Sequence, residues 1–555
     1  MAENFAQDSG APRPARAGRF RVDPWSLGAL LIAAVVLMPI VSVVWLAFNP
    51  TENIWPHLVS TTLPRYFSNT VILAGAVGAI TAAVGTGTAW LVTMYDFPCR
   101  GFLARALLFP LAIPAYVGAY ALVDFLEYAG PVQTGMRALF GWQSAREYWF
   151  PEIRSRLGAI VVLSAALFPY VFLLARAAFQ EQSGGAHEVA RALGAGPWRR
   201  FLRVGLPLAR PAVAAGVAIV MMETVADFGT VDYFAVQTLT TGIFSVWLQS
   251  GNAGGAAQIA SVMLGIILVL MALEKFSRRR SRFHEISRNA RPISPIPLAG
   301  GAAWLATAAC AFPFLLGFVL PGGVILWHAL NNPGYWVDPG LARAFAHTLI
   351  TGGAAAVICV LAALFMVYGV RQSGRRLPRL LLPLTTLGYA APGAVLGVGI
   401  LIPLARFDNW LADVILSVTG HDVGLILTGS AFAIVLAYVV RFFAIAEGAT
   451  DAALERVAPN LPLAARSLGR TAGGALREIH VPLIRGSVAT ALLLVFVDCV
   501  KELPATLLLR PFNYNTLATR VHEKASLEQI GQAAPAALLV IAVGLLAVML
   551  MARGR

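Results

Sequence analysis

Four acidic residues within apolar stretches are the side chains of this 555-residue sequence best placed to do chemistry. Glu223 and Asp227 lie four positions apart, and Asp498 and Glu502 repeat that spacing. Residues four apart share one face of a helix, so each pair predicts two carboxylates on a common face. Acidic groups in apolar spans are costly, and they commonly mark ion or proton pathways. We expect the four to line a translocation pathway or gate, or alternatively to form internal ion pairs and helix caps. Lys501, beside Glu502, is a candidate partner for one of them.

The elements that carry these residues are long and apolar. The sequence is 58% hydrophobic and only 13% charged, unlike a soluble domain. Runs of about twenty apolar residues are long enough to cross a bilayer as helices. The sequence therefore predicts an all-α polytopic membrane protein with about 12 transmembrane helices. The twelve predicted spans are 27–49, 70–95, 103–125, 159–180, 208–226, 259–276, 300–327, 346–370, 380–405, 424–446, 484–502 and 533–552.

The basic residues, which give a net charge of +14, predict the orientation of these helices. Arginines gather before the first span, around 278–291, and in the short loop 371–379. Under the positive-inside rule these segments are cytoplasmic, and an even number of spans places both termini there. We expect a multi-pass protein of the bacterial inner membrane. The arginines serve topology and lipid contact in this interpretation, and nucleic acid is not an expected partner.

An internal repeat divides the chain into two halves. Residues 188–207 and 463–482, the first and second elbow, each place a glycine between two short helical stretches and end at a proline. The alignment extends beyond the elbows at a constant offset, pairing Arg210 with Arg485, Glu223 with Asp498, Asp227 with Glu502 and Thr241 with Thr516. The predicted organisation is an N-terminal tail (1–26), a first six-helix half (27–276), a cytoplasmic linker (277–299) and a second six-helix half (300–552). Two such elbows indicate docking sites for two copies of a partner.

The elbow pattern resembles the signature of permease subunits of binding-protein-dependent ABC importers. The second elbow has Leu463 where the first has its acidic residue. The matching positions are Glu188, Ala190, Gly194, Leu206 and Pro207 in the first elbow, and Ala464, Ala465, Gly469, Ile479 and Pro482 in the second. The resemblance implies a type I importer permease fold and elbows that couple to two copies of a cytoplasmic ABC ATPase. It also implies a periplasmic substrate-binding protein, with the single fused chain acting as a pseudo-dimer.

The chain itself offers no nucleotide-binding motif. A Walker A sequence needs Gly-Lys-Ser/Thr, and none of Lys275, Lys501 and Lys524 follows a glycine. We therefore expect ATP hydrolysis in a separate subunit, with no catalytic residues and no cofactor here.

A wider similarity to fused ferric-iron permeases suggests the substrate. It is carried by the segments 222–243 and 501–520, and thiamine and phosphonate permeases share the fused layout. Fe³⁺ prefers anionic oxygen ligands, which the acidic residues could supply. The eight histidines show no paired spacing, so no stable metal site is expected.

Two other function classes follow from the same residues. The four acids could serve a proton-coupled secondary transporter, since such transporters also use internal repeats. An even number of spans per half gives a parallel repeat, however, and proton exchange needs no elbows. A membrane-embedded enzyme would need a paired histidine and carboxylate constellation, which the sequence lacks.

Overall fold

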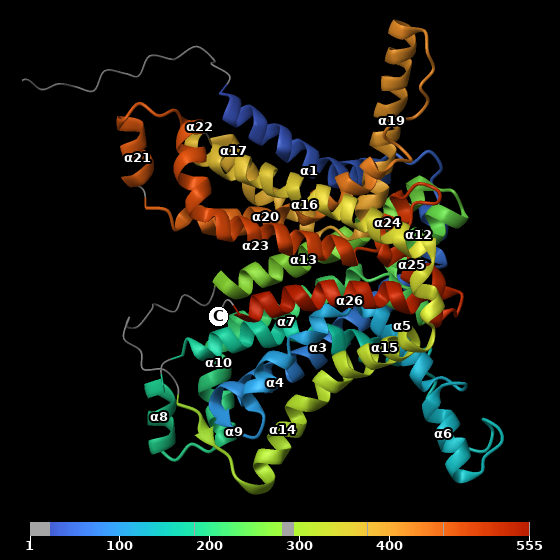
Figure 1. Ribbon diagram of the computed structural model, residues 1–555, viewed down its shortest axis with the longest axis vertical. Coiled ribbons are helices and arrows are strands. Elements are labelled where there is room, and N and C mark those ends of the chain that lie inside the picture. The colour runs from blue at the N-terminus through green and yellow to red at the C-terminus, as the bar shows by residue number, and fades with distance from the viewer. Residues whose placement is uncertain (1–22, 183, 280–293, 374–375, 459, 554–555) are drawn as a thin grey trace, which may run out of the picture.

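The computed structural model describes residues 23–182, 184–279, 294–373, 376–458 and 460–553 (Figure 1). The predicted tail, 1–26, and linker, 277–299, lie largely outside these residues.

The described chain is all-α, as predicted, apart from one two-residue strand pair. Eleven helices are long and apolar enough to cross a membrane, and a bent pair of helices makes a twelfth. Several spans join shorter helices end to end. The eleven are α1 (Pro24–Phe48), α3 (Leu63–Met94), α7 (Arg156–Gln180), the run α9–η2–α10 (Pro197–Ala226), α13 (Ala253–Arg279), the run α14–η4–α15 (Gly300–Asn331), α16 (Pro339–Ser373), α19 (Gly393–Thr419), α20 (Ala431–Glu455), the run α22–η6–α23 (Ala472–Lys501) and α26 (Ile530–Arg553).

The third span of the first half, predicted as one helix over 103–125, is broken. Its first part is α4 (Arg100–Ala106) with the short turn η1 (Phe109–Ala112), and its second part begins with α5 (Ala115–Leu126). The two parts meet at an angle of 96°. Pro114, at the break, has an extended backbone with φ −57° and ψ 141°. Proline lacks the N–H that a continuous helix would use, and it disfavours helix in the residue before it.

The third span of the second half breaks in the same way, so the prediction of one helix over 380–405 is also wrong. Helices α17 (Arg376–Thr385) and α18 (Leu387–Ala390) precede the break at Pro392, whose φ is −58° and ψ is 148°. Helix α19 then continues to Thr419, well past the end of the predicted span. Hydropathy alone did not reveal either break.

The end of α19 projects from the molecule, as α6 (Pro131–Phe140) does on the other half (Figure 1). The chain returning from α19 is held by one carboxylate. Asp408 is fully buried and accepts hydrogen bonds from the backbone N–H groups of Ile426, Leu427 and Thr428 at 3.0, 2.9 and 2.6 Å.

Each half places its first helix against the other half. Helix α1 packs on α16, α17 and α19, while the run α14–η4–α15 packs on α3, α4, α5 and α7. Two glycines allow the close approach, because a Cβ on Gly399 would lie 2.3 Å from the Pro39 carbonyl oxygen and one on Gly317 would lie 2.3 Å from the Ala165 carbonyl oxygen. The halves are therefore interlocked in space.

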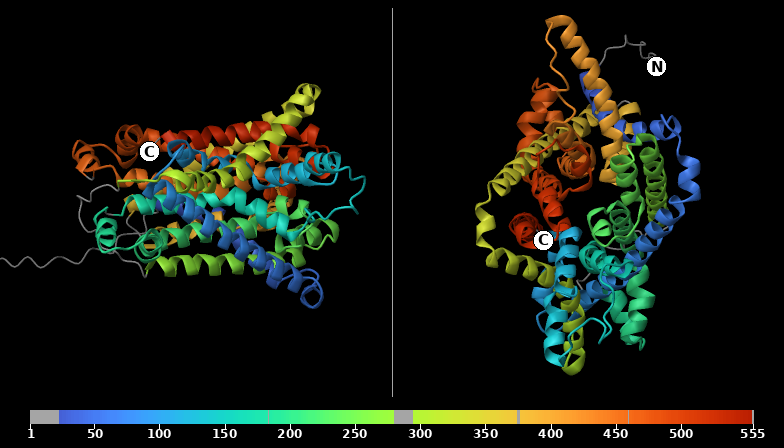
Figure 2. Two further views of the ribbon diagram at one scale, coloured as in Figure 1. Left: turned by 90° about the horizontal axis from the view of Figure 1, so that it is seen from below. Right: turned by 90° about the vertical axis from the view of Figure 1, so that its right-hand side faces the viewer.

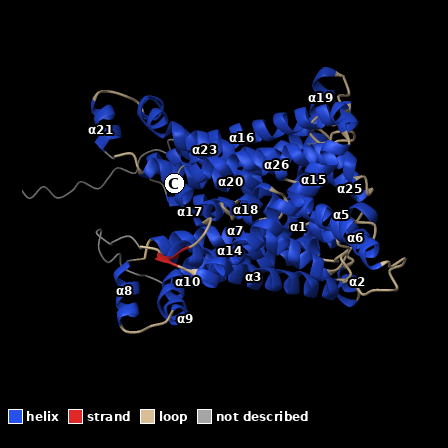
Figure 3. Cartoon of the chain, turned by 60° about the horizontal axis from the view of Figure 1, so that its bottom comes forward, coloured by secondary structure: helices blue, strands red, loops and turns tan. Residues whose placement is uncertain are grey.

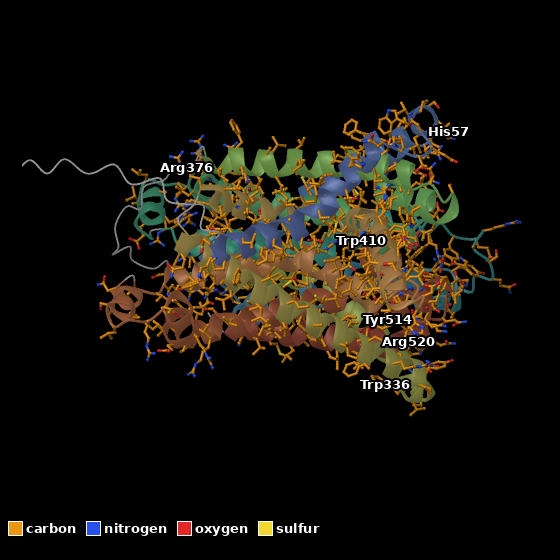
Figure 4. All side chains as sticks on the ribbon, turned by 90° about the horizontal axis from the view of Figure 1, so that it is seen from above. His57, Trp336, Arg376, Trp410, Tyr514 and Arg520 are labelled. Carbon is orange, nitrogen blue, oxygen red and sulfur yellow. The ribbon has the colours of Figure 1, made fainter. Side chains whose placement is uncertain are left out.

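The two elbows lie at one end of the helix bundle, which we call the elbow end. Helices α8 (Gly184–Ala192) and α21 (Asn460–Ser467) mark it, and α26 ends there (Figures 1 and 3). The left view of Figure 2 shows both elbow helices at this end, away from α6. Arg376 lies at the elbow end, whereas Trp336, Tyr514 and Arg520 lie at the opposite, outer end (Figure 4). Strand β1 (Tyr95–Asp96) pairs in parallel with β2 (Ile296–Pro297).

Short helices form the outer end and show the true register of the repeat. They are α11 (Gly229–Tyr233), α12 (Leu239–Phe244), α24 (Pro504–Leu509) and α25 (Leu517–Ser526). Thr238 caps α12 and exchanges hydrogen bonds with Thr241, and Thr516 caps α25 and does the same with Thr519. Thr516 therefore corresponds to Thr238, and the predicted pairing with Thr241 is wrong. The longer connection after α24 shifts the offset between the halves by three residues.

Candidate functional site

The four acidic residues singled out from the sequence all line one cavity between the halves. This gate cavity has a volume of about 170 Å³. Glu223 lies in the last turn of α10 (Leu206–Ala226), and Asp227 directly follows that helix in extended backbone. Asp498 lies in the last turn of α23 (Val481–Lys501), and Glu502 directly follows that helix in the same way. The structure thus brings together side chains that are 275 residues apart in the chain.

Asp227 caps a short outer helix. Its carboxylate accepts hydrogen bonds from the N–H groups of Thr230 and Val231 at 3.0 and 3.1 Å, and from the Thr230 hydroxyl at 3.0 Å. These groups belong to the first turn of α11, where backbone N–H groups have no partner within the helix.

Glu502 does the same for α24. It accepts from the N–H groups of Ala505 and Thr506 at 3.0 and 3.1 Å, and from the Thr506 hydroxyl at 2.8 Å. The helix-cap interpretation therefore describes the geometry of Asp227 and Glu502.

Glu223 and Asp498 lie one helical turn nearer the elbows and are partly buried. The Tyr389 hydroxyl donates to Glu223 across the interface between the halves, at a long 3.4 Å. Tyr170 also lines the cavity. Unlike Asp227 and Glu502, these two carboxylates do not cap a helix.

Two basic residues offset part of this negative charge. Arg441, on α20, lies 3.7 Å from Glu502, joining the Nη1 and Oε1 atoms. Lys501 donates to the Leu111 carbonyl at 2.7 Å, so the lysine contacts a backbone oxygen of the first half. Sequence reasoning overlooked Arg441, although an arginine inside the apolar run 424–446 was a usable signal.

The first elbow ends α8 with a glycine in the left-handed region. Gly194 has φ 79°, and the N–H of Ala195 donates to the Ala190 carbonyl at 3.0 Å. This bond closes the Schellman motif that commonly ends helices at glycine.

The second elbow has the same geometry. Gly469 has φ 82°, and the N–H of Arg470 donates to the Ala465 carbonyl at 3.0 Å. Each of these atoms lies 275 positions after its counterpart, so the two elbows are built alike despite the change at Leu463.

Large apolar side chains of both elbows face outward. Leu193 and its counterpart Leu468 are each 82% exposed, and Trp198 is 71% exposed. Glu188 and Ala464 are exposed, Ala190 is partly buried and Ala465 is buried. Exposed leucines at the tips of two equivalent helices are suited to the groove of another protein.

Each elbow joins its span through a π-helical turn. These turns are η2 (Phe201–Gly205) and η6 (Leu476–His480), which occupy equivalent positions of the repeat. Leu206 and Pro207 begin α10, Ile479 lies in η6 and Pro482 is the second residue of α23. Single π-helical turns inside helices are frequent at functional sites.

The first elbow is fastened to its span by buried polar groups. Gln182 donates to the Gly205 carbonyl at 3.0 Å and lies 2.8 Å from His187 Nε2. Burial, and then the positive charge of Arg200, hold the pKa of His187 below its usual range. In the second elbow, the Tyr368 hydroxyl donates to the Ala472 carbonyl at 2.7 Å. Hydrogen bonds therefore hold the first elbow against the start of its following span, and the second elbow against α16.

Among the described residues, no group of three or more His, Cys, Asp or Glu side chains is placed to hold a metal ion.

Part of the first half is similar to a known family of transport proteins. Residues 77–283 match the family model of the binding-protein-dependent transport system inner membrane component. These residues include the first elbow, Glu223 and Asp227.

Curated relatives match over longer stretches. The chain is 25% identical over 485 residues to the Fe(3+)-transport system permease protein FbpB 2 of Haemophilus influenzae, covering 86% of this chain and 88% of that protein. It is 22% identical over 520 residues to the ferric transport system permease protein FbpB of Actinobacillus pleuropneumoniae, covering 88% and 72%. The sulfate transport system permease protein CysT of Escherichia coli is 26% identical over 254 residues, covering 44% of this chain and 88% of that protein. One permease of that size thus corresponds to less than half of this chain.

Proposed function

We propose that this chain, whose residues 77–283 form a binding-protein-dependent transport permease domain, is the transmembrane subunit of an ATP-driven importer of ferric iron. The observation that carries the proposal is the convergence of two equivalent acid pairs on one cavity, each on the helix that begins at an elbow. The substrate follows the names of the FbpB relatives, which match along most of the chain.

The second helical stretch of each elbow leads to the acid pair through one nearly continuous helical run. The runs Pro197–Ala226 and Ala472–Lys501 each have 30 residues, a length of about 45 Å at the rise of an α-helix. A displacement at the elbow end is therefore transmitted to the gate cavity without passing through a flexible loop. This is the physical basis that we propose for coupling ATP hydrolysis to alternating access.

The proposed partners follow from this geometry. Two copies of a cytoplasmic ATPase grip the elbows through the exposed leucines Leu193 and Leu468, and a periplasmic binding protein docks on the outer end. The elbow end is then cytoplasmic, and so are both termini. ATP and the loaded binding protein must favour one conformation over the other by a few kcal/mol to drive the cycle.

Within the gate cavity, Glu223 and Asp498 supply the anionic oxygens that a hard trivalent cation prefers. Two carboxylates from opposite halves give few ligands, so the ion is held weakly and is released when these two carboxylates move apart. Asp227 and Glu502 maintain the outer helices that cover the cavity.

Reconstitution tests the proposal directly. Proteoliposomes would contain this chain with its ATPase, and binding protein loaded with Fe³⁺, thiamine or a phosphonate would be added in turn. We expect only the iron-loaded form to stimulate ATP hydrolysis, and we expect the Glu223→Gln/Asp498→Asn double variant to reduce iron uptake while the ATPase still assembles. Stimulation by another ligand alone would reject iron. Uptake driven by a proton gradient without ATPase would reject the importer class.

A further inference from the structure

A second cavity opens between the halves at the elbow end and is strongly basic. This vestibule has a volume of about 1190 Å³. Its walls come from α3, α4 and α7 of the first half, and from α23, α26 and the C-terminal end of α20 of the second. Its charged lining residues are Arg100, Arg105, Arg176 and Arg456. Among the described residues that line it, none is acidic.

The vestibule adjoins the gate cavity. Leu111 lines both cavities, and its carbonyl accepts the hydrogen bond from Lys501. An ion that leaves the acidic gate toward the elbow end therefore passes a lysine and then enters a space lined by four arginines. Such a change in the sign of the local charge opposes the movement of a bare cation.

Backbone carbonyl oxygens hold the guanidinium groups of two vestibule arginines through their Nε atoms. Arg105 Nε donates to the Gly101 carbonyl at 3.2 Å, and Arg456 Nε donates to the Ala452 carbonyl at 3.3 Å. Neither guanidinium has a carboxylate within ion-pair distance in the part of the chain that the structure describes. The Nη groups of both side chains are thus available to a ligand, in the planar geometry that suits carboxylates and phosphates.

Topology alone does not account for this arrangement. The positive-inside rule explains why arginines gather at one end of the bundle. It does not require arginines from both halves to line a single cavity that adjoins the gate. Nearby carboxylates neutralise the vestibule only in part. Asp96 lies 3.9 Å from Arg100, whereas Asp451 is paired with Arg371 at 2.6 Å, outside the vestibule.

We propose that the vestibule binds a multivalent oxyanion, of the phosphate or tricarboxylate class. The bound anion removes the positive barrier and takes up the cation that the gate releases. This role as acceptor rests on the proposed function, whereas the binding of the anion does not.

A binding measurement on the purified full-length chain tests the inference without ATPase, binding protein or iron. Citrate and inorganic phosphate would be titrated by calorimetry in detergent, with ionic strength held constant by KCl. We expect the Arg105→Gln/Arg456→Gln variant to bind citrate about 100-fold more weakly, since each charge-assisted interaction lost costs about tenfold. The matched control is Arg343→Gln, an exposed arginine at the outer end, which leaves the affinity unchanged.

Two lipid conditions distinguish the source of the oxyanion. In nanodiscs of zwitterionic lipid alone, citrate and phosphate should bind as they do in detergent. If anionic phospholipid abolishes that binding in the parent, and the double variant retains less of this lipid, then a lipid headgroup supplies the oxyanion. If binding persists in anionic lipid, a soluble anion supplies it. The proposal would be overturned if the parent and the double variant bound citrate and phosphate with equal affinity. It would also be overturned if neither the soluble anions nor the anionic lipid bound in a way that depends on Arg105 and Arg456. Because the assay contains no iron, failure of the ferric-iron proposal would leave its result unaffected.

Discussion

Arg441 and Glu502 face each other inside the membrane-spanning part of the second half, 3.7 Å apart between Nη1 and Oε1. The Glu502 side chain is 1% exposed and the Arg441 side chain is 13% exposed. Glu502 also accepts hydrogen bonds from the first turn of α24. This one carboxylate therefore links Arg441 of α20 to the short helix α24 at the outer side of the gate cavity.

Removing the arginine should destabilise this region strongly. Arg441→Gln leaves the Glu502 carboxylate buried without a cation, and loss of one partner of a buried pair costs about 3–5 kcal/mol. Thermal unfolding in detergent should show the decrease, and Arg441→Lys should restore part of it. Adding Glu502→Gln to Arg441→Gln should recover stability, because no uncompensated charge then remains. A double variant that is less stable than Arg441→Gln would contradict this account of the pair.

The two kinds of acidic residue in the gate cavity should behave differently when neutralised. Asp227→Ala removes a helix cap and should cost about 0.5–2 kcal/mol of stability. Asp498→Asn keeps the side-chain shape and caps no helix, so it should reduce transport with little change in the unfolding temperature. Uptake assays and unfolding curves on both variants would separate the roles. Equal loss of stability in both would show that Asp498 is a structural residue.

The elbow glycines should resist replacement by residues that cannot adopt positive φ. Gly194→Pro and Gly469→Pro cannot be accommodated at φ 79° and 82°, since proline is held near −65°. We expect each to abolish ATPase coupling while the protein still folds in the membrane. Gly194→Asn is the matched control, because asparagine enters the left-handed region readily, and it should retain most activity. Unimpaired transport in both proline variants would refute the assignment of the elbows.

Acid should weaken the outer contact between the halves. The Tyr120 hydroxyl lies 2.8 Å from His522 Nδ1, and burial, with a further contribution from Arg510, lowers the pKa of His522 to about 4. The folded protein therefore favours the neutral imidazole, whereas the unfolded chain protonates near pH 6.5. The resulting stability is present above pH 6.5 and is lost as the pH falls toward 4, by roughly 3 kcal/mol.

Unfolding temperatures measured from pH 7.5 to 4 would check this window. His522→Gln keeps a hydrogen-bonding group beside Tyr120 but does not titrate. It should flatten the part of the profile below pH 6.5. A variant profile parallel to that of the parent would exclude His522 as the responsible group.

Much of the architecture could be predicted because it follows from local sequence. Apolar runs gave the fold class and the approximate spans, and a constant offset gave the equivalence of Gly194 and Gly469. The repeat of the acid pairs indicated that the four carboxylates lie together, and all four line one cavity. The predicted common helix face is wrong, because Asp227 and Glu502 follow the last residues of α10 and α23 in extended backbone.

What could not be predicted depends on long-range packing. The breaks at Pro114 and Pro392 lie within apolar runs, and hydropathy does not distinguish a bent span from a straight one. The partner of Lys501 is the Leu111 carbonyl, which no reading of neighbouring residues could identify. The three-residue shift that pairs Thr238 with Thr516 became visible only from the capping contacts.

The first helix of each half packs against the other half, and this bears on why the two halves are joined in one chain. Helix α1 and the run α14–η4–α15 each act as an arm that embraces the opposite half, so the attachment of the halves is a property of packed surfaces inside the bilayer. The covalent linker is then not needed to hold the two halves together. Its contribution is that both halves are made in equal amounts and that each half meets its own partner half. The packing of the first helices also means that the halves cannot drift apart during a cycle. In the proposed cycle, relative motion of the halves would therefore be a rotation, carried by the two helical runs that lead from the elbows to the gate cavity.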